Sequence, residues 1–257
     1  MNKSKTRYEI YTFGLKSVLG LFEKRPEAIR YLVFVEELSP KLGAICSFLA
    51  KNKKAYKQLS NNELNEMAGY KEHGGVIAVA VPPSVKKPNY ADFTRWQTER
   101  SPLLMLESFT SGRALGSLLQ AAHSLGMKRV LLVHPKDQAH FSDEAFLSAE
   151  GAHEHLEFYE VEAASSLFKK LKDKYISIVG APSGIGGRNL NFAKPINAPG
   201  RPFMLLINGS EAGPASRTLG QAEYVIQIPG ITQGNAQLKP DILGSILLAW
   251  LQSRRKL

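Results

Sequence analysis

Residues 106–132, LESFTSGRALGSLLQAAHSLGMKRVLL, decide the fold of this chain. A turn opens the stretch, an apolar helical pattern follows over residues 114–125 with Gly116 inside it, and the stretch ends in a buried strand pattern, RVLLVH. Another apolar strand pattern, PLLMLE, comes immediately before the turn. Strand, helix and strand in this order are typical of a parallel sheet with helices packed on it.

The same alternation continues to the end of the chain. We expect further strands at LEFYEV, ISIVGA, PFMLLING and YVIQIPG, and further helices at residues 142–149, at SSLFKKLKDK and at residues 240–254. Apolar strands separated by helices indicate a mostly parallel sheet that is covered on both faces. The prediction is an α/β domain over residues 101–257.

Residues 1–84 are predicted to form a separate, smaller α/β domain. Short helices and strands alternate in it until two prolines stop the strand GVIAVAVPP. The next segment, PPSVKKPNYADFTRW, holds three prolines and two lysines, so residues 85–100 are expected to link the domains. Tyr90 and Trp96 in this linker are candidates either for stacking on a base or for pinning the domains together.

The charge of the chain is positive and unevenly distributed. Lys and Arg number 33 against 23 Asp and Glu, a net charge of +10, and residues 1–87 carry 15 basic and 8 acidic side chains. Phosphate contacts and counterion release make nucleic acid the leading partner class, with solubility alone as the alternative. One basic turn is suited to RNA phosphates, although a solvated helix end would have the same composition. It contains Lys51, Lys53, Lys54 and Lys57.

Cysteine and histidine usage argues against a disulfide framework and a metal centre. The single cysteine, Cys46, lies in the apolar helical run AICSFLA, so a buried thiol in a reducing compartment is expected. The six histidines show no metal-ligand spacing. The sequence has no run of roughly 18 apolar residues, and its N-terminus has no apolar signal-peptide core. We therefore predict a cytoplasmic protein with no membrane span.

Four segments, in order, resemble motifs of the SpoU, or TrmH, branch of the knotted RNA methyltransferases. In the small domain, AGYKEHGGVIAV matches a family segment in which Gly74 stands at a Gln. SAEGAHEHL matches a second segment, with Glu154 and His155 at the corresponding places, where an interdomain or dimer surface is expected. LLINGSEAGPAS and VIQIPGITQGNAQLKPDILGSILLAWL are similar to the two loops near the end of the family's catalytic domain. The match covers nearly the whole chain.

The resemblance implies a fold, a cofactor and partners. These are an N-terminal RNA-docking domain, a C-terminal domain threaded into a trefoil knot, a homodimer as the active unit, and tRNA or rRNA as the substrate. The implied cofactor is S-adenosylmethionine, held largely through backbone groups by Gly209, Ile228, Pro229 and Leu238. Gly209 is also favoured on physical grounds, because a ligand approaches the end of a buried strand most closely where no Cβ intrudes.

The reaction of the resembling family moves a methyl group to a ribose 2′-hydroxyl, assisted by a motif Arg with a supporting Asn and Glu. In this chain Ala114 stands at the Asn and Gln120 at the Arg, whereas Glu211 matches the Glu. Gln carries no charge to hold a phosphate or to favour an alkoxide. Arg113, one residue before the Asn position, is a candidate compensating cation.

The last loop also departs from the family pattern. Gln237 and Lys239 flank Leu238 where the family has Ser-Leu-Asn, which predicts weakened binding of the cofactor. Two functions are therefore left open by the sequence. One is an S-adenosylmethionine-dependent RNA 2′-O-ribose methyltransferase, and the other is a non-catalytic RNA-binding paralogue that keeps the knot and the dimer.

Overall fold

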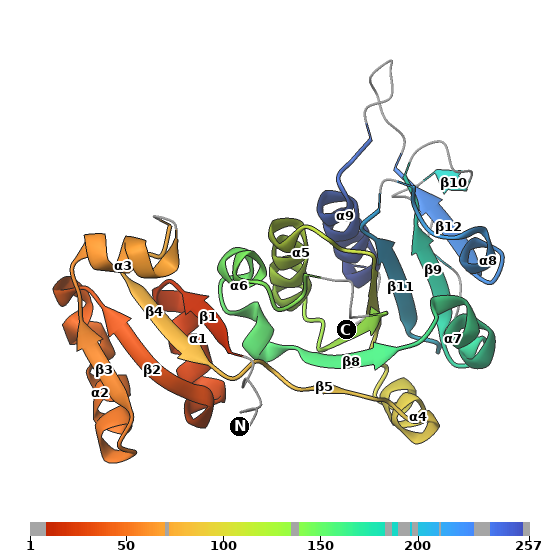
Figure 1. Cartoon of the computed structure of the whole chain (residues 1–257). Helices are drawn as coiled ribbons and strands as arrows, with labels where there is room; N and C mark the ends of the chain where they lie inside the picture. The colour runs from red at the N-terminus through yellow and green to blue at the C-terminus, as the bar shows by residue number, and fades with distance from the viewer. Residues whose placement is uncertain are drawn as a thin grey trace, which may run out of the picture.

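The computed structural model describes residues 9–69, 72–134, 139–182, 187–189, 196, 200–210, 212–228 and 237–253. These residues form two sheets, a small one near the amino end of the chain and a larger one that holds the remaining strands (Figure 1). The predicted α/β class, with a small N-terminal part and a mostly parallel C-terminal sheet, is confirmed. None of the helices in these ranges is both long and apolar enough to cross a bilayer.

The small sheet has mixed strand directions and packs against helices. Its strands are β1 (Ile10–Phe13), β2 (Ile29–Phe34), β3 (Ala55–Gln58) and β4 (Val76–Ala80). The helices beside it are α1 (Leu15–Lys24), α2 (Ser39–Lys51) and α3 (Asn61–Ala68). β1 and β2 run antiparallel to β4, and β3 runs parallel to β2, which gives the order β1-β4-β2-β3. Cys46, expected to be buried, is only half-buried against this part of the core.

The larger sheet is parallel at every pairing between its described strands. Its strands are β5 (Val85–Lys86), β6 (Leu103–Glu107), β7 (Arg129–Val133), β8 (Glu157–Val161), β9 (Ile176–Gly180), β10 (Arg188–Asn189), β11 (Phe203–Asn208) and β12 (Tyr224–Gln227). The helices around it are α4 (Tyr90–Thr98), α5 (Gly112–Ser124), α6 (Asp143–Ala149), α7 (Ala164–Leu171), α8 (Ser216–Leu219) and α9 (Pro240–Ser253). The strand order is β10-β12-β9-β11-β6-β7-β8-β5.

Helices cover both faces of the larger sheet, so its central strands β6, β7, β9 and β11 are almost entirely buried. Along β6, Leu104 and Leu106 pack toward α5 and α9, whereas Leu103 and Met105 pack toward α4 and α7. Figure 1 shows these two pairs of helices on opposite sides of the sheet. A strand buried on both faces is expected to be a continuous apolar run, which is the pattern of PLLMLE. This explains why the sequence located the central strands.

The segment expected to be a linker contains regular structure that packs on the larger sheet. β5 is the edge strand of the sheet and pairs with β8, and α4 begins at a capping box formed by Asn89 and Asp92. Trp96 is 0% exposed and lies under the guanidinium of Arg129, whose central carbon is 5.0 Å from the ring centroid. Trp96 therefore stacks on protein and not on a base, whereas Tyr90 is 49% exposed.

Gly116 brings α5 and α6 close together. A Cβ at this position would collide with the carbonyl oxygen of Ala145 and would lie 2.9 Å from the Cβ of Ser148. Gly112, one turn earlier, faces the hydroxyl of Ser142 in the same way. The glycine that the sequence singled out is thus required for helix packing and not for contact with a ligand.

The two parts of the protein meet through α1 and β1 on one side and through α6 and the short 3-10 helix Ala152–His155 on the other. Arg25 binds Glu154 through two hydrogen bonds, Nε to Oε2 at 2.6 Å and Nη2 to Oε1 at 2.9 Å. The ring of His155 stacks on that of His123, with their centroids 4.5 Å apart. Glu154 and His155 therefore lie at the junction of the two parts, one of the two places expected for them.

Candidate functional site

The carboxyl ends of three neighbouring strands, β9, β11 and β6, meet at one edge of the larger sheet. The chain leaves β6 through α5 toward β7 on one side, whereas α7 carries it from β8 back to β9 on the other side of β6. The strand order therefore reverses between β6 and β11. In open parallel sheets such a reversal leaves a crevice at the carboxyl ends of the strands, where ligands bind.

A cavity of about 770 Å³ lies at this reversal. Its walls come from the loop after β6, from the residues after β9 and β11, and from the start of α9. The lining residues are Phe109, Ser111, Arg113, Ala114, Pro182, Gly209, Ser210, Gln237, Leu238, Lys239, Pro240 and Asp241. Segments more than 100 residues apart in the sequence thus form one site, and its volume is within the range of about 300–1,000 Å³ that is usual for small-molecule sites.

The loops after β6 and β11 are fixed to each other by hydrogen bonds between the last residues of the two strands. Asn208 and Glu107 are paired in register, and the Asn208 amide donates to the Glu107 carboxylate at 2.8 Å. The backbone N–H of Gly209 donates to the carbonyl of Glu107 at 2.8 Å. Asn208 Oδ1 in turn accepts from the N–H of Ser210 at 2.8 Å. These bonds hold the cavity wall in one geometry.

Gly209 allows the two loops to approach each other. A Cβ at this position would lie 2.8 Å from the Cα of Phe109 and 2.9 Å from the carbonyl oxygen of Ser108. Ser108 has φ 58°, the left-handed region, so the loop after β6 turns sharply at the point of contact. No side chain fits between the two backbones without moving one of them.

The polar groups of the cavity include hydrogen-bond donors and one carboxylate, that of Asp241. Ser111 caps α5, its hydroxyl accepting from the Ala114 N–H at 3.3 Å, so the positive end of the helix dipole faces the site. Arg113 and Lys239 add two cationic side chains. Asp241 Oδ1 is buried and has no hydrogen-bond partner within the described residues. The arrangement can hold an anionic group at the helix and a hydrogen-bond donor at Asp241.

The structure brings some of the expected site residues together and leaves others apart. Arg113, Gly209 and Leu238 all line the cavity. Gln120 is exposed further along α5, outside the lining, and Ile228 is partly buried at the edge of the core. The two remaining expectations, Glu211 and Pro229, lie outside the described residues.

The basic turn of the small sheet divides into two kinds of lysine. Lys51, Lys53 and Lys57 are exposed, which is compatible with contact to phosphates. The Lys54 ammonium instead donates to the carbonyls of Glu27 at 2.7 Å and Ile29 at 2.6 Å, and burial lowers its pKa. The Lys54 ammonium thus joins the end of the turn to the start of β2, and its contact with a phosphate stays a prediction.

Sequence reasoning missed Glu107, Asn208, Ser111 and Asp241. Glu107 and Asn208 are the single polar residues that end the apolar strands LLMLE and FMLLIN, and this position at a strand's carboxyl end was a usable signal. Their mutual bond depends on the pairing of β6 with β11, which no local pattern reveals. Asp241 Oδ1, which has no hydrogen-bond partner among the described residues, likewise becomes visible only when the cavity is assembled.

Two family models match the chain. The SpoU rRNA Methylase family matches residues 101–236, and the family described as RNA 2′-O ribose methyltransferase substrate binding matches residues 11–85. The first match contains the loops after β6, β9 and β11 that line the cavity. The second match contains the whole small sheet except the first residue of β1.

Curated proteins similar to the chain are named as methyltransferases. An uncharacterized tRNA/rRNA methyltransferase of Haemophilus influenzae is 27% identical over 172 residues, 66% of this chain and 48% of that protein. A 23S rRNA (guanosine-2′-O-)-methyltransferase RlmB of Acinetobacter baylyi is 25% identical over 173 residues, 66% of this chain and 69% of that protein. The chain thus spans about half the length of the Haemophilus relative that it matches.

Solved structures share the fold. An AdoMet-bound rRNA methyltransferase from Sinorhizobium meliloti superposes with a TM-score of 0.74 at 15% identity, covering 98% of this chain and 90% of that one. At this level of identity the likeness concerns the fold and extends over both sheets.

Proposed function

We propose that this chain, which belongs to the SpoU rRNA Methylase family, transfers a methyl group from S-adenosylmethionine to a ribose 2′-hydroxyl of RNA. The observation that carries the proposal is the cavity at the carboxyl ends of β9, β11 and β6, where the loop of residues 108–114 meets Gly209. The small sheet, matched by a substrate-binding family, supports RNA as the substrate. The named activity of the Acinetobacter relative supports the ribose 2′-oxygen as the acceptor.

The cavity fits S-adenosylmethionine in its size and its polar groups. The start of α5 and Lys239 suit the carboxylate of the cofactor, and Asp241 Oδ1 offers an acceptor to its ammonium or ribose hydroxyls. Phe109 and Leu238 provide apolar surface for the adenine ring. When bound, the cofactor supplies an electrophilic methyl group on its sulfonium. We retain the expectation of weakened binding, because the Ser and Asn side chains of the family's last loop are absent at positions 237 and 239.

Arg113 is the residue of this chain best placed to assist the acceptor. A ribose 2′-hydroxyl is a very weak acid, so its attack benefits from positioning and from a cation beside the oxygen as charge develops there. Arg113 lines the cavity, whereas Ala114 has no polar side chain and Gln120 lies outside it. We assign Arg113 the role of holding the target nucleotide and stabilising the oxyanion.

We also propose that the active unit is a cytoplasmic homodimer whose last segment forms a knot. Family membership supports the knot and the dimer, and the exposed apolar side chains of Leu238 and Ile242 beside the cavity support a partner surface there. Leu238 lines the cavity as well, so a second copy on this surface would narrow its entrance.

Arg113→Ala is expected to reduce methyl transfer about 100-fold while leaving cofactor affinity within a few-fold of the wild type. The reason is that the cation acts on developing charge in the transition state more than on the bound cofactor. Calorimetry with S-adenosylmethionine and labelled-methyl incorporation into total RNA measure the two effects, with Arg113→Lys as the charge-conserving control. No binding heat at millimolar cofactor would contradict the proposal and favour the non-catalytic paralogue.

Gly209→Ala is expected to weaken S-adenosylmethionine binding at least tenfold. The new methyl group would displace the loop at Phe109 by its contact with backbone atoms, and overpacking of this kind costs about 1–3 kcal/mol. Gly220→Ala is the matched control, because a Cβ at Gly220 meets only ordinary contacts of 3.5 Å or more. Equal affinities of the two variants, measured by calorimetry, would remove Gly209 from the site.

A further inference from the structure

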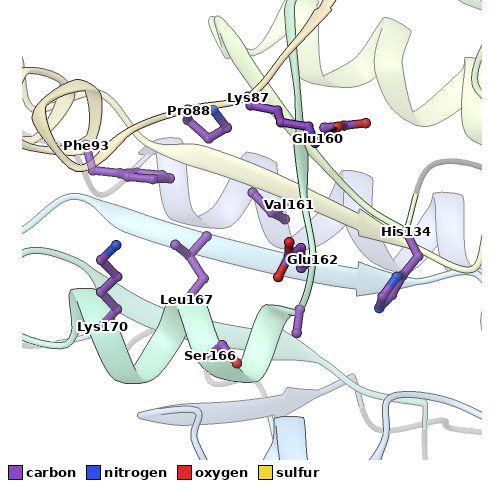
Figure 2. Close-up of a pocket in the computed structure, with 11 residues that line it drawn as sticks. Lys87, Pro88, Phe93, His134, Glu160, Val161, Glu162, Ser166, Leu167 and Lys170 are labelled. Carbon is purple, nitrogen blue, oxygen red and sulfur yellow. Dashed lines mark ion pairs between the residues drawn. The ribbon is translucent and has the colours of Figure 1, made fainter.

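A second hollow lies on the face of the larger sheet that α4 and α7 cover, between α7 and the segment that joins β5 to α4. Its volume is about 570 Å³, and Figure 2 shows Phe93, Val161 and Leu167 on its floor. Pro88 closes it on the β5 side. We call it the aromatic hollow. It shares no residue with the cavity at Gly209.

The two ends of the aromatic hollow carry different charges. Lys170 lies near Phe93 at one end of the hollow, whereas Glu162 lies along the floor toward His134 at the other end (Figure 2). Glu160 is joined to Lys87 by an ion pair of 3.1 Å at the rim. An apolar floor with a carboxylate toward one end suits a flat ring that carries hydrogen-bond donors on its edge.

A third hollow, of about 540 Å³, adjoins the aromatic hollow on the side of α8. We call it the basic hollow, because three of its six lining residues are cationic and none of them is acidic. The six lining residues are Ser165, Ser166, Lys169, Lys170, Arg217 and Gln221. The N-cap of α7, Ala163, makes no side-chain capping bond, so the first N–H groups of this helix add to the positive potential. This composition suits a phosphate group.

The two hollows share Ser166 and Lys170, which lie one helical turn apart on α7. A ligand with a flat base in one hollow and a phosphate in the other would therefore straddle a single ridge. Tyr90, half exposed, lies close to the same ridge, with the ammonium groups of Lys170 and Lys174 at 5.4 and 5.3 Å from its ring centroid. Aromatic surface beside cations is the usual composition of sites for single-stranded nucleic acid.

We propose that this face binds one nucleotide, with its base in the aromatic hollow and its phosphate in the basic hollow, as a site separate from methyl transfer. Glu162 is the acceptor for the base edge, and guanine fits it best because two adjacent N–H donors match one carboxylate. Arg217 and Lys169 hold the phosphate. The nucleotide is either part of an RNA strand or free in solution, since the chemistry of recognition is the same.

The site is tested by binding, without cofactor or turnover. Calorimetry of the full chain with 5′-GMP, guanosine and 5′-UMP is expected to rank GMP first, because only GMP has both the phosphate and the two adjacent donors. Arg217→Gln should weaken GMP at least tenfold and leave guanosine unchanged, whereas Glu162→Gln should remove the preference for GMP over UMP. Lys128→Gln, an exposed lysine elsewhere, is the matched charge control.

Competition by a short single-stranded RNA identifies the source of the nucleotide. If the site belongs to RNA, the oligomer displaces GMP, and Arg217→Gln lowers the salt dependence of oligomer binding by about 0.7 in logarithmic slope. If the site takes a free nucleotide, GMP binds and the oligomer does not displace it. The proposal is overturned if GMP does not bind, or if both variants bind it as the wild type does. Gly209→Ala should leave GMP binding intact, so failure here is distinct from failure of the methyltransferase proposal.

Discussion

Arg25→Ala is expected to lower the free energy of unfolding by about 3 kcal/mol or more. The side chain of Glu154 is 1% exposed and is bound by two charged hydrogen bonds from Arg25. A third hydrogen bond joins Arg25 Nη1 to the carbonyl of Val81 at 2.9 Å. Removing the cation leaves a buried carboxylate without its partner, and breaking a buried pair in this way costs about 3–5 kcal/mol. Urea unfolding followed by circular dichroism measures the loss.

An exposed ion pair at the same junction provides the control. Lys16 lies 3.0 Å from Glu150, again between α1 and the end of α6, but the Lys16 side chain is 81% exposed. Lys16→Ala should therefore change the free energy of unfolding by less than about 1 kcal/mol. The double variant Arg25→Met with Glu154→Leu should recover most of the stability lost in Arg25→Ala, because no charge is left buried. Equal losses in Lys16→Ala and Arg25→Ala would contradict this account.

The central part of the fold could be predicted from the sequence because its signals are local. The helix expected at residues 114–125 is α5, Gly112–Ser124, and the one expected at residues 142–149 is α6, which starts after the cap Ser142. The missed strand β5 has two residues and therefore no periodicity of its own. It is extended because it pairs with β8, and that contact depends on the fold as a whole.

The candidate site was predictable in part for the same reason. Gly209 follows a buried strand, so the requirement for a small residue can be inferred from one segment. The bond between Glu107 and Asn208 requires the pairing of strands about 100 residues apart, and the two hollows on α7 require the docking of α4 and α8. Local patterns therefore identified single loops, whereas the surfaces formed between elements came only from the structure.

The junction that depends on Arg25 also contains a histidine whose charge is strongly disfavoured. His153 is 1% exposed, its Nε2 lies 2.8 Å from the carbonyl oxygen of His140, and its ring stacks on Phe146 with centroids 4.1 Å apart. Nδ1 is buried and has no hydrogen-bond partner within the described residues. Burial lowers the pKa of His153 to about 4; the hydrogen bond to the His140 carbonyl opposes this shift, and the charges of His140 and Arg25 add smaller lowering contributions.

The lowered pKa of His153 predicts a loss of stability in mild acid. The unfolded chain binds a proton at this residue near pH 6.5, whereas the folded protein does so only near pH 4, so the contribution is fully present above pH 6.5 and is lost as the pH falls toward 4. Between pH 7 and pH 5 the expected loss from this residue is about 2 kcal/mol. Urea unfolding at a series of pH values measures it.

His153→Phe and His153→Gln should both remove this part of the pH dependence, since neither side chain titrates. Phe keeps the apolar packing against Phe146 but loses the hydrogen bond to His140, whereas Gln keeps a donor and loses ring contact, so their stabilities at pH 7 will differ. Agreement of the two variants in slope, despite that difference, separates titration from packing. If either variant keeps the wild-type loss of about 2 kcal/mol between pH 7 and pH 5, the acid sensitivity lies elsewhere than at His153.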